Sequence, residues 1–64
     1  MTMTGKELVN ELKKNGWQLD RVHGSHHIMI KDGHHPAAVP VHGNKDIPKG
    51  TLNQLLKDTK LKGR

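Results

Sequence analysis

The sequence predicts a small α+β domain with the element order α-β-β-β-α, in which a three-stranded antiparallel sheet carries both helices on one face. Apolar residues recur at helical spacing near the two ends of the chain and alternate at strand spacing between them. Turn-forming residues separate these segments, and neither a repeat nor a linker is visible. A chain of 64 residues has room for one small core, so we expect a single domain over residues 1–64.

The first helix is predicted over Gly5–Asn15. Thr4 and Glu7 have the spacing of a capping box, in which each side chain satisfies a free backbone N–H group at the start of the helix. Gly16 follows as a left-handed stop. The helix carries one apolar stripe at helical spacing, formed by Leu8, Val9 and Leu12.

Three short segments rich in strand-forming residues are predicted as strands, over Trp17–Val22, His26–Lys31 and Ala37–Val41. By simple alternation, Val22 falls on the opposite face of the first strand from Trp17 and Leu19. A bulge or a strand end near Arg21 is therefore expected. Asp32-Gly33 supplies a turn before the third strand.

The second helix is predicted with Pro48 at its first position, where the missing N–H group costs nothing. One core is expected to collect the apolar positions of all five elements, namely Leu8, Leu12, Trp17, Leu19, Ile28, Ile30, Val39, Val41, Leu52, Leu55 and Leu56. In this interpretation the two isoleucines of the middle strand face the helices. Met29, between them, faces the open side of the sheet.

The composition favours a polyanionic partner, most simply a nucleic acid. The net charge is +5, and the segment from Lys49 to Arg64 carries five cations against one acid. RNA-binding sheets that stack several bases on Phe and Tyr are disfavoured, because Trp17 is the one Phe, Trp or Tyr residue.

Two further features bear on where the protein acts. The chain has no cysteine, which excludes disulfides and thiolate chemistry and fits a reducing cytoplasm. No apolar run approaches the ~20 residues of a membrane span, and the N-terminus lacks the apolar core of a signal peptide. We therefore expect a cytoplasmic protein that makes no membrane contact.

Histidine is the most unusual component of the chain, which has six: His23, His26, His27, His34, His35 and His42. A metal site, a solvated cluster and an acid–base site are the competing interpretations. No His-Glu-x-x-His helix, cysteine pair or carboxylate cluster is present, so we expect neither a metal nor a cofactor. RNA cleavage without a metal needs a base that titrates near neutral pH, as histidine does, and a cation to stabilise the phosphorane.

The acid–base interpretation centres on the start of the middle strand. Gly24 and Ser25 stand where the chain enters that strand, so the backbone can approach a ligand closely. His26 follows at the strand end and would lie at the rim of the core. His27 would lie on the open face. Periodicity alone does not choose between the two histidines.

Four segments together resemble the HicA toxin family: Asn15-Gly16-Trp17, Gly24-Ser25-His26-His27, Val39-Pro40-Val41-His42 and the stretch from Asp46 to Leu52. The resemblance extends from about Gly5 to Leu61. It implies a fold like that of the double-stranded-RNA-binding domain, mRNA cleavage under stress, and inhibition by a HicB-like antitoxin.

The resemblance also implies roles for individual residues. The functional histidine of the family usually follows Gly-Ser directly, which makes His26 the first choice for the catalytic residue. Some members keep a histidine one place later, so His27 is the second choice. Gly24 and Ser25 match the motif as supports, and we expect RNA contacts from three basic residues, Lys31, Lys45 and Lys49.

Two alternatives remain open at this stage. A domain of the same fold can bind double-stranded RNA without cutting it, although such domains usually present a lysine cluster at the start of the second helix. Here only Lys45 and Lys49 flank that position. A basic chain can also act purely as the docking partner of an acidic antitoxin.

Overall fold

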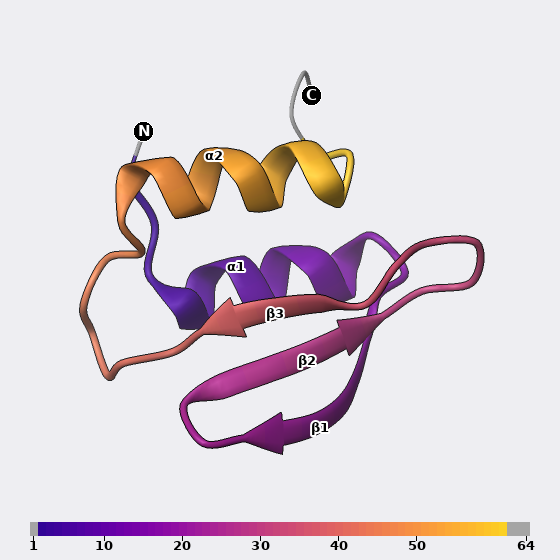
Figure 1. The fold of residues 1–64 in the computed structure, drawn as a ribbon, viewed down its shortest axis with the longest axis horizontal. Coiled ribbons are helices and arrows are strands. Elements are labelled where there is room, and N and C mark those ends of the chain that lie inside the picture. The colour runs from indigo at the N-terminus through magenta and orange to yellow at the C-terminus, as the bar shows by residue number, and fades with distance from the viewer. Residues whose placement is uncertain (1, 62–64) are drawn as a thin grey trace.

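The computed structural model describes residues 2–61 and confirms the predicted order of elements. These elements are α1 (Gly5–Lys14), β1 (Gln18–His23), β2 (His26–Ile30), β3 (Ala37–Pro40) and α2 (Lys49–Asp58). The strands form one antiparallel sheet in the spatial order β1-β2-β3 (Figure 1). Within the described residues, no helix has the length and apolar character needed to cross a membrane.

Local capping sets both ends of α1, as predicted. The Glu7 N–H group donates to the Thr4 hydroxyl oxygen at 3.1 Å, and the Thr4 N–H group donates to the Glu7 carboxylate at 2.8 Å. Gly16 adopts a φ of +91°, in the left-handed region that favours glycine. The Trp17 N–H group then donates to the Leu12 carbonyl at 3.0 Å, which turns the chain from α1 towards β1.

The start of α2 differs from the prediction by one position. Pro48 is the residue before the helix, because its ψ of 140° is extended and not helical. Its carbonyl oxygen nevertheless accepts the first bond of the helix, from the Leu52 N–H group at 2.8 Å. Pro48 thus directly precedes the helix, and because it has no N–H group it leaves no donor unsatisfied there.

Of the bulge or strand end expected near Arg21, the structure has the bulge, and it determines which side chains share a face. The pairing register with β2 shifts between Leu19 and Arg21. Leu19 pairs with Met29, and Val22 pairs with His27. Because directly paired residues of an antiparallel sheet lie on the same face, the bulge brings Leu19 and Val22 onto one side.

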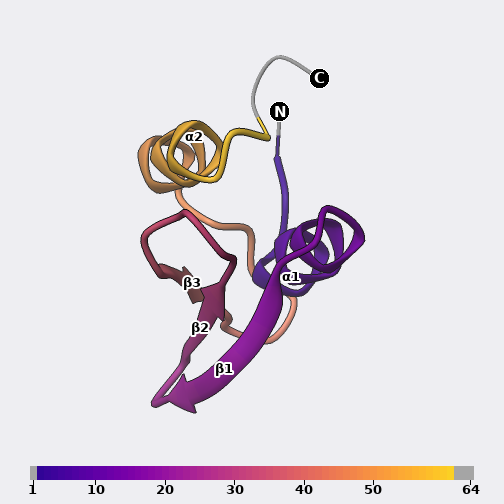
Figure 2. The same ribbon diagram turned by 90° about the vertical axis from the view of Figure 1, so that its right-hand side faces the viewer.

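Both helices cover the same face of the sheet (Figure 2). α1 contacts all three strands and α2 contacts β3. The buried apolar side chains form one cluster, consisting of Leu8, Val9, Leu12, Trp17, Met29, Ala37, Val39, Ile47, Leu52, Leu55, Leu56 and Leu61. Val41, also predicted in the core, is partly buried and packs against this cluster.

The predicted orientation of the middle strand was wrong. Met29 is fully buried under the helices, whereas Ile28 and Ile30 are half-buried on the opposite, open face. Alternation gives the period of a strand but not its direction, and β2 carries apolar residues on both faces. The direction follows from pairing with β3, where Met29 lies opposite buried Ala37.

Leu19 was also wrongly assigned to the core. Its side chain is 41% exposed, and that of Val22 is 53% exposed. Both lie on the helix side of the sheet, but at its β1 edge. Figure 2 shows that the turn between β1 and β2 projects past both helices, which leaves the end of β1 next to this turn, where Val22 lies, uncovered.

Candidate active site

A cleft of about 350 Å³ lies on the helix side of the sheet, between α1 and β1. Its walls come from elements that are distant in sequence, and they consist of Lys6, Val9, Asn10, Lys13, Leu19, His27 and Val41. The cleft therefore combines one imidazole, one amide and two ammonium groups with an apolar lining. A concave apolar surface with a few convergent polar groups is typical of a ligand site.

The polar wall of the cleft is one face of α1. Lys6, Asn10 and Lys13 are spaced i, i+4 and i+7, which places them in line on a helix of 3.6 residues per turn. All three are exposed, while Leu8 and Leu12 on the other side of α1 are fully buried. At 1.5 Å per residue, Lys6 and Lys13 stand roughly 10 Å apart along the axis, on either side of Asn10.

His27 brings the imidazole to this cleft from the centre of the sheet. Its cross-strand neighbours are Val22 on β1 and Val39 on β3. The ring is half-buried, and Nδ1 is buried without a hydrogen-bond partner among the described residues. A ligand in the cleft would therefore meet the ring through Nε2. The sheet fixes the position of this histidine, because both flanking strands are paired to it.

His26 occupies a different environment. Its side chain is exposed on the open face of the sheet, opposite to the face that carries His27. It pairs with His23 across β1 and with Pro40 across β3. On the same face, the Arg21 guanidinium is held by Asp20 in an exposed ion pair at 2.7 Å. The two candidate histidines thus lie on opposite faces of the sheet.

The Gly-Ser motif forms the two-residue turn between β1 and β2. Gly24 has a φ of +63°, and a Cβ atom placed on it would meet no atom within 4 Å. The Ser25 carbonyl accepts a bond from the Val41 N–H group at 2.8 Å. This bond ties the turn to Val41, which follows β3 and is itself part of the cleft wall.

The structure places none of the three predicted basic residues in the cleft with His27. The Lys31 ammonium group donates a hydrogen bond to the Asn15 carbonyl oxygen at 2.8 Å, and this bond caps the C-terminal end of α1. Lys45 is exposed in the loop before α2, and Lys49 begins that helix. None of the three lines the cleft.

Lys6, Asn10 and Lys13 were missed by the sequence analysis. Their spacing on the polar side of α1 was visible in the sequence. It could not be connected with His27, however, while the middle strand was assigned to the wrong face.

Replacement of Lys31 by alanine tests whether its role is structural. We expect the free energy of unfolding to fall by about 1 kcal/mol, because the last carbonyls of α1 lose a charged donor. RNA affinity should stay unchanged. Urea unfolding and RNA titration of the same preparation measure both quantities. An equally stable variant that binds RNA more weakly would instead make Lys31 an RNA contact.

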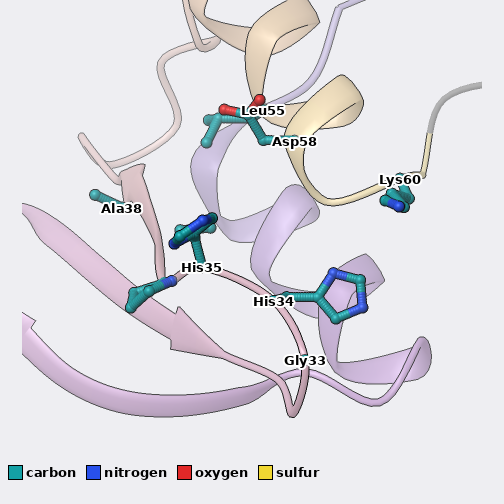
Figure 3. A pocket seen from close by; sticks show the side chains of 9 residues that line it. Gly33, His34, His35, Ala38, Leu55, Asp58 and Lys60 are labelled. Atoms are coloured by element: carbon teal, nitrogen blue, oxygen red, sulfur yellow. The ribbon is translucent and has the colours of Figure 1, made fainter.

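A larger cavity, of about 460 Å³, lies elsewhere, between the loop after β2 and the end of α2 (Figure 3). His34, His35, Asp58 and Lys60 surround it. The His34 ring packs against the buried Trp17 ring, with centroids 5.2 Å apart and an interplanar angle of 55°. In residues 2–61 no group of three or more His, Asp or Glu side chains is arranged to hold a metal ion.

The comparison with protein families agrees with this architecture. The family model described as "HicA toxin of bacterial toxin-antitoxin" matches residues 5–61, nearly the whole chain. No curated protein matches the chain. The matched region contains all five elements and every residue of the cleft. The chain therefore belongs to the HicA family of toxins from bacterial toxin–antitoxin systems.

Proposed function

We propose that this chain is a metal-independent endoribonuclease that cuts mRNA, with His27 as its catalytic residue. HicA toxins are known as mRNA-cleaving toxins, which supports the reaction class. The observation that carries the residue assignment is the cleft itself, where His27 lies on the same concave surface as Lys6 and Lys13. His26, the first choice from the resemblance, is exposed on the opposite face of the sheet and does not line this cleft. An mRNA substrate makes the cytoplasm the expected place of action.

The proposed reaction is a transesterification at one phosphodiester. His27 takes the proton of the 2′-hydroxyl, and the 2′-oxygen forms a bond to the adjacent phosphorus. The bond from phosphorus to the 5′-oxygen breaks, and the imidazolium returns its proton to that leaving oxygen. One of the two cleft lysines, Lys6 or Lys13, stabilises the extra negative charge of the phosphorane, and the other contacts a neighbouring phosphate of the strand. The products are a 2′,3′-cyclic phosphate and a 5′-hydroxyl end, with no net consumption of protons.

Incubation of the purified protein with end-labelled RNA in EDTA tests this reaction. We expect cleavage at an undiminished rate, and fragments that carry the two ends named above. Loss of cleavage in EDTA would instead indicate a metal-dependent nuclease. Intact RNA with a tight mobility shift would indicate the alternative, an RNA-binding module of the same fold that does not cut.

Removal of both cleft lysines, in a Lys6→Ala/Lys13→Ala double variant, should weaken RNA binding and make it less dependent on salt. Each phosphate contact to a single strand contributes about 0.7 to the slope of log K against log salt, so we expect the slope to fall by about 1.4. The matched control is Lys57→Ala. Lys57 is exposed on α2, so this variant removes a positive charge that lies away from the cleft. An unchanged slope in the double variant would show that RNA binds elsewhere.

A toxin of this family implies an antitoxin partner. We propose a HicB-like protein that covers the His27 cleft and also contacts the exposed apolar residues beside it, Leu19 and Val22. A partner that binds only the folded chain stabilises it by mass action, so the melting temperature should rise with partner concentration. The same melting temperature with and without saturating partner would contradict this coupling.

A further inference from the structure

We infer that β1 is a self-association surface, through which two copies of this chain pair edge to edge and join their sheets into one sheet of six strands. The inference goes beyond the proposed function and does not depend on RNA cleavage. It rests on three features of β1. These are its unpaired edge, its two exposed apolar side chains, and the order of its two charges.

The outer side of β1 pairs with no other strand in the described part of the chain. The spatial order of the sheet is β1-β2-β3, and Figure 1 shows β1 as the outermost strand, at the bottom of the view. All six of its residues are exposed. The backbone N–H and C=O groups along such an edge are a template for another strand. The opposite edge is less suited, because β3 has only four residues and lies between Pro36 and Pro40, which have no N–H group.

The exposed apolar surface of the molecule is concentrated on this same strand. Leu19 and Val22 are 41% and 53% exposed, and they are the two exposed large apolar residues among residues 2–61. The bulge in β1 places both of them on the helix side of the sheet. Apolar side chains along an unpaired edge favour the addition of a strand, because pairing would cover them.

One antiparallel register makes β1 complementary to itself. A two-fold axis between residues 20 and 21 places Leu19 opposite the second copy's Val22, and Val22 opposite its Leu19. The same axis places Asp20 opposite the second copy's Arg21, and the reverse. In this register the whole of β1 pairs with the whole of the second β1. Apolar residues therefore face apolar residues, and each charge faces one of opposite sign.

The neighbouring registers lack this complementarity. A shift by one residue in either direction places Asp20 opposite Asp20, or Arg21 opposite Arg21. A shift by two residues places Leu19 opposite Asp20, or Val22 opposite Arg21. Like charges directly opposite each other destabilise a sheet, and an apolar residue gains nothing from a charged neighbour. Among these five registers, the charges and the apolar residues of β1 thus select the one that is centred between residues 20 and 21.

Charges and bulges usually protect a sheet edge from such pairing. On β1 the two charges have opposite sign and already form an ion pair at 2.7 Å, so four alternating charges would surround the axis of the dimer. The axis passes through the bulge, so the extra residue of one strand faces the extra residue of the other. Neither protection therefore acts against a second copy in this register.

The dimer keeps the helices of both copies on one side of the joined sheet, because its axis is perpendicular to that sheet. The two His27 clefts would therefore open on the same face. The antitoxin proposed above contacts the same two apolar residues, so the antitoxin and a second copy would exclude each other.

The association is expected to be weak. Each copy contributes one strand of six residues, whereas a standard interface takes about 20–30 residues from each side. Each copy also carries a net charge of +5, which opposes association. We therefore expect monomers at about 10 μM and a substantial fraction of dimer at about 1 mM.

Charge reversal on either side of the axis tests both the surface and the register. Arg21→Asp leaves two acids at positions 20 and 21, and Asp20→Arg leaves two bases, so each variant should repel its own copies. NMR diffusion measurements over this concentration range should give each variant a dissociation constant raised by about tenfold or more. An equimolar mixture of the two variants should recover the dimer as a heterodimer, because opposite charges face each other again. Circular dichroism should show that both variants are folded, since both positions are exposed.

Lys57→Asp is the matched control, because it changes the net charge by the same amount as Arg21→Asp but lies on α2. It should dimerise at least as well as the parent chain. A parent chain that stays monomeric at about 1 mM would overturn the inference. So would a dimer that survives both charge reversals, or a mixture of the two variants that stays monomeric. RNA cleavage is measured separately, and a chain that dimerises in this way without cutting RNA keeps the inference and loses the nuclease.

Discussion

Replacement of His27 by alanine is expected to lower the rate of RNA cleavage by about 10²- to 10⁴-fold, the range that a positioned acid–base group contributes. The same replacement at His26 should leave the rate close to that of the parent chain. The two residues are adjacent in β2 but face opposite sides of the sheet. Only His27 lies in the cleft with Lys6 and Lys13. Rates under single-turnover conditions, with enzyme in excess, separate the chemical step from RNA binding.

The fold should survive the change at His27. Its Nδ1 is buried without a partner in the described residues, so alanine removes an unsatisfied polar atom along with some packing. His27→Gln is the control for packing, because it fills the space and cannot shuttle a proton. Circular dichroism and melting curves should resemble those of the parent chain for both variants. A His27→Gln protein as active as the parent, or a His26→Ala protein without activity, would contradict this assignment and indicate that the catalytic residue lies on the open face of the sheet.

The second large effect is expected at Gly5, where α1 approaches the end of β3. A Cβ atom on Gly5 would lie 2.2 Å from the Pro40 carbonyl oxygen and 2.8 Å from the Val41 Cα atom. Both are backbone atoms, so the helix must move away. We expect Gly5→Ala to lower the free energy of unfolding by about 1–3 kcal/mol, the usual cost of overpacking. A chain of this length has roughly 3–10 kcal/mol in total, so the loss is large.

Gly50→Ala provides the matched control for that measurement. Gly50 lies in the first turn of α2, and an added Cβ atom would meet nothing within 4 Å. Alanine there reduces the freedom of the unfolded chain and should raise stability by about 0.4–1 kcal/mol. Urea unfolding midpoints should therefore move in opposite directions for the two variants. A Gly5→Ala protein that is as stable as the parent would show that α1 and β3 are not in close contact.

Features of the fold with local determinants were predictable from the sequence. The capping box at Thr4 and Glu7, the left-handed Gly16 and the bulge near Arg21 each depend on residues within a few positions of one another. Such signals fix where an element begins, ends or bends, whatever it later packs against. The element order followed from the apolar periodicity and from the turn-forming residues between the segments.

The face of the middle strand was not predictable in the same way. Two isoleucines alternate with one methionine in β2, and both faces can be buried to some extent. Which face the helices cover depends on pairing with Val39 and Ala37, which are far along the chain. His27 shares the face of Met29. The pairing of β2 with β3 therefore also determines which of the two histidines faces α1. The cleft lysines could not be assigned before this pairing was known.

Binding of an uncleavable RNA tests the central claim most directly. A short RNA with 2′-O-methyl groups lacks the attacking hydroxyl, so it remains intact while the NMR signals of the histidine rings and backbone amides are followed. We predict that the His27 ring and the amides around Lys6 and Lys13 shift together on binding, and that the His26 ring does not. Shifts concentrated at His26 and His23, with His27 unchanged, would contradict a site between α1 and the sheet.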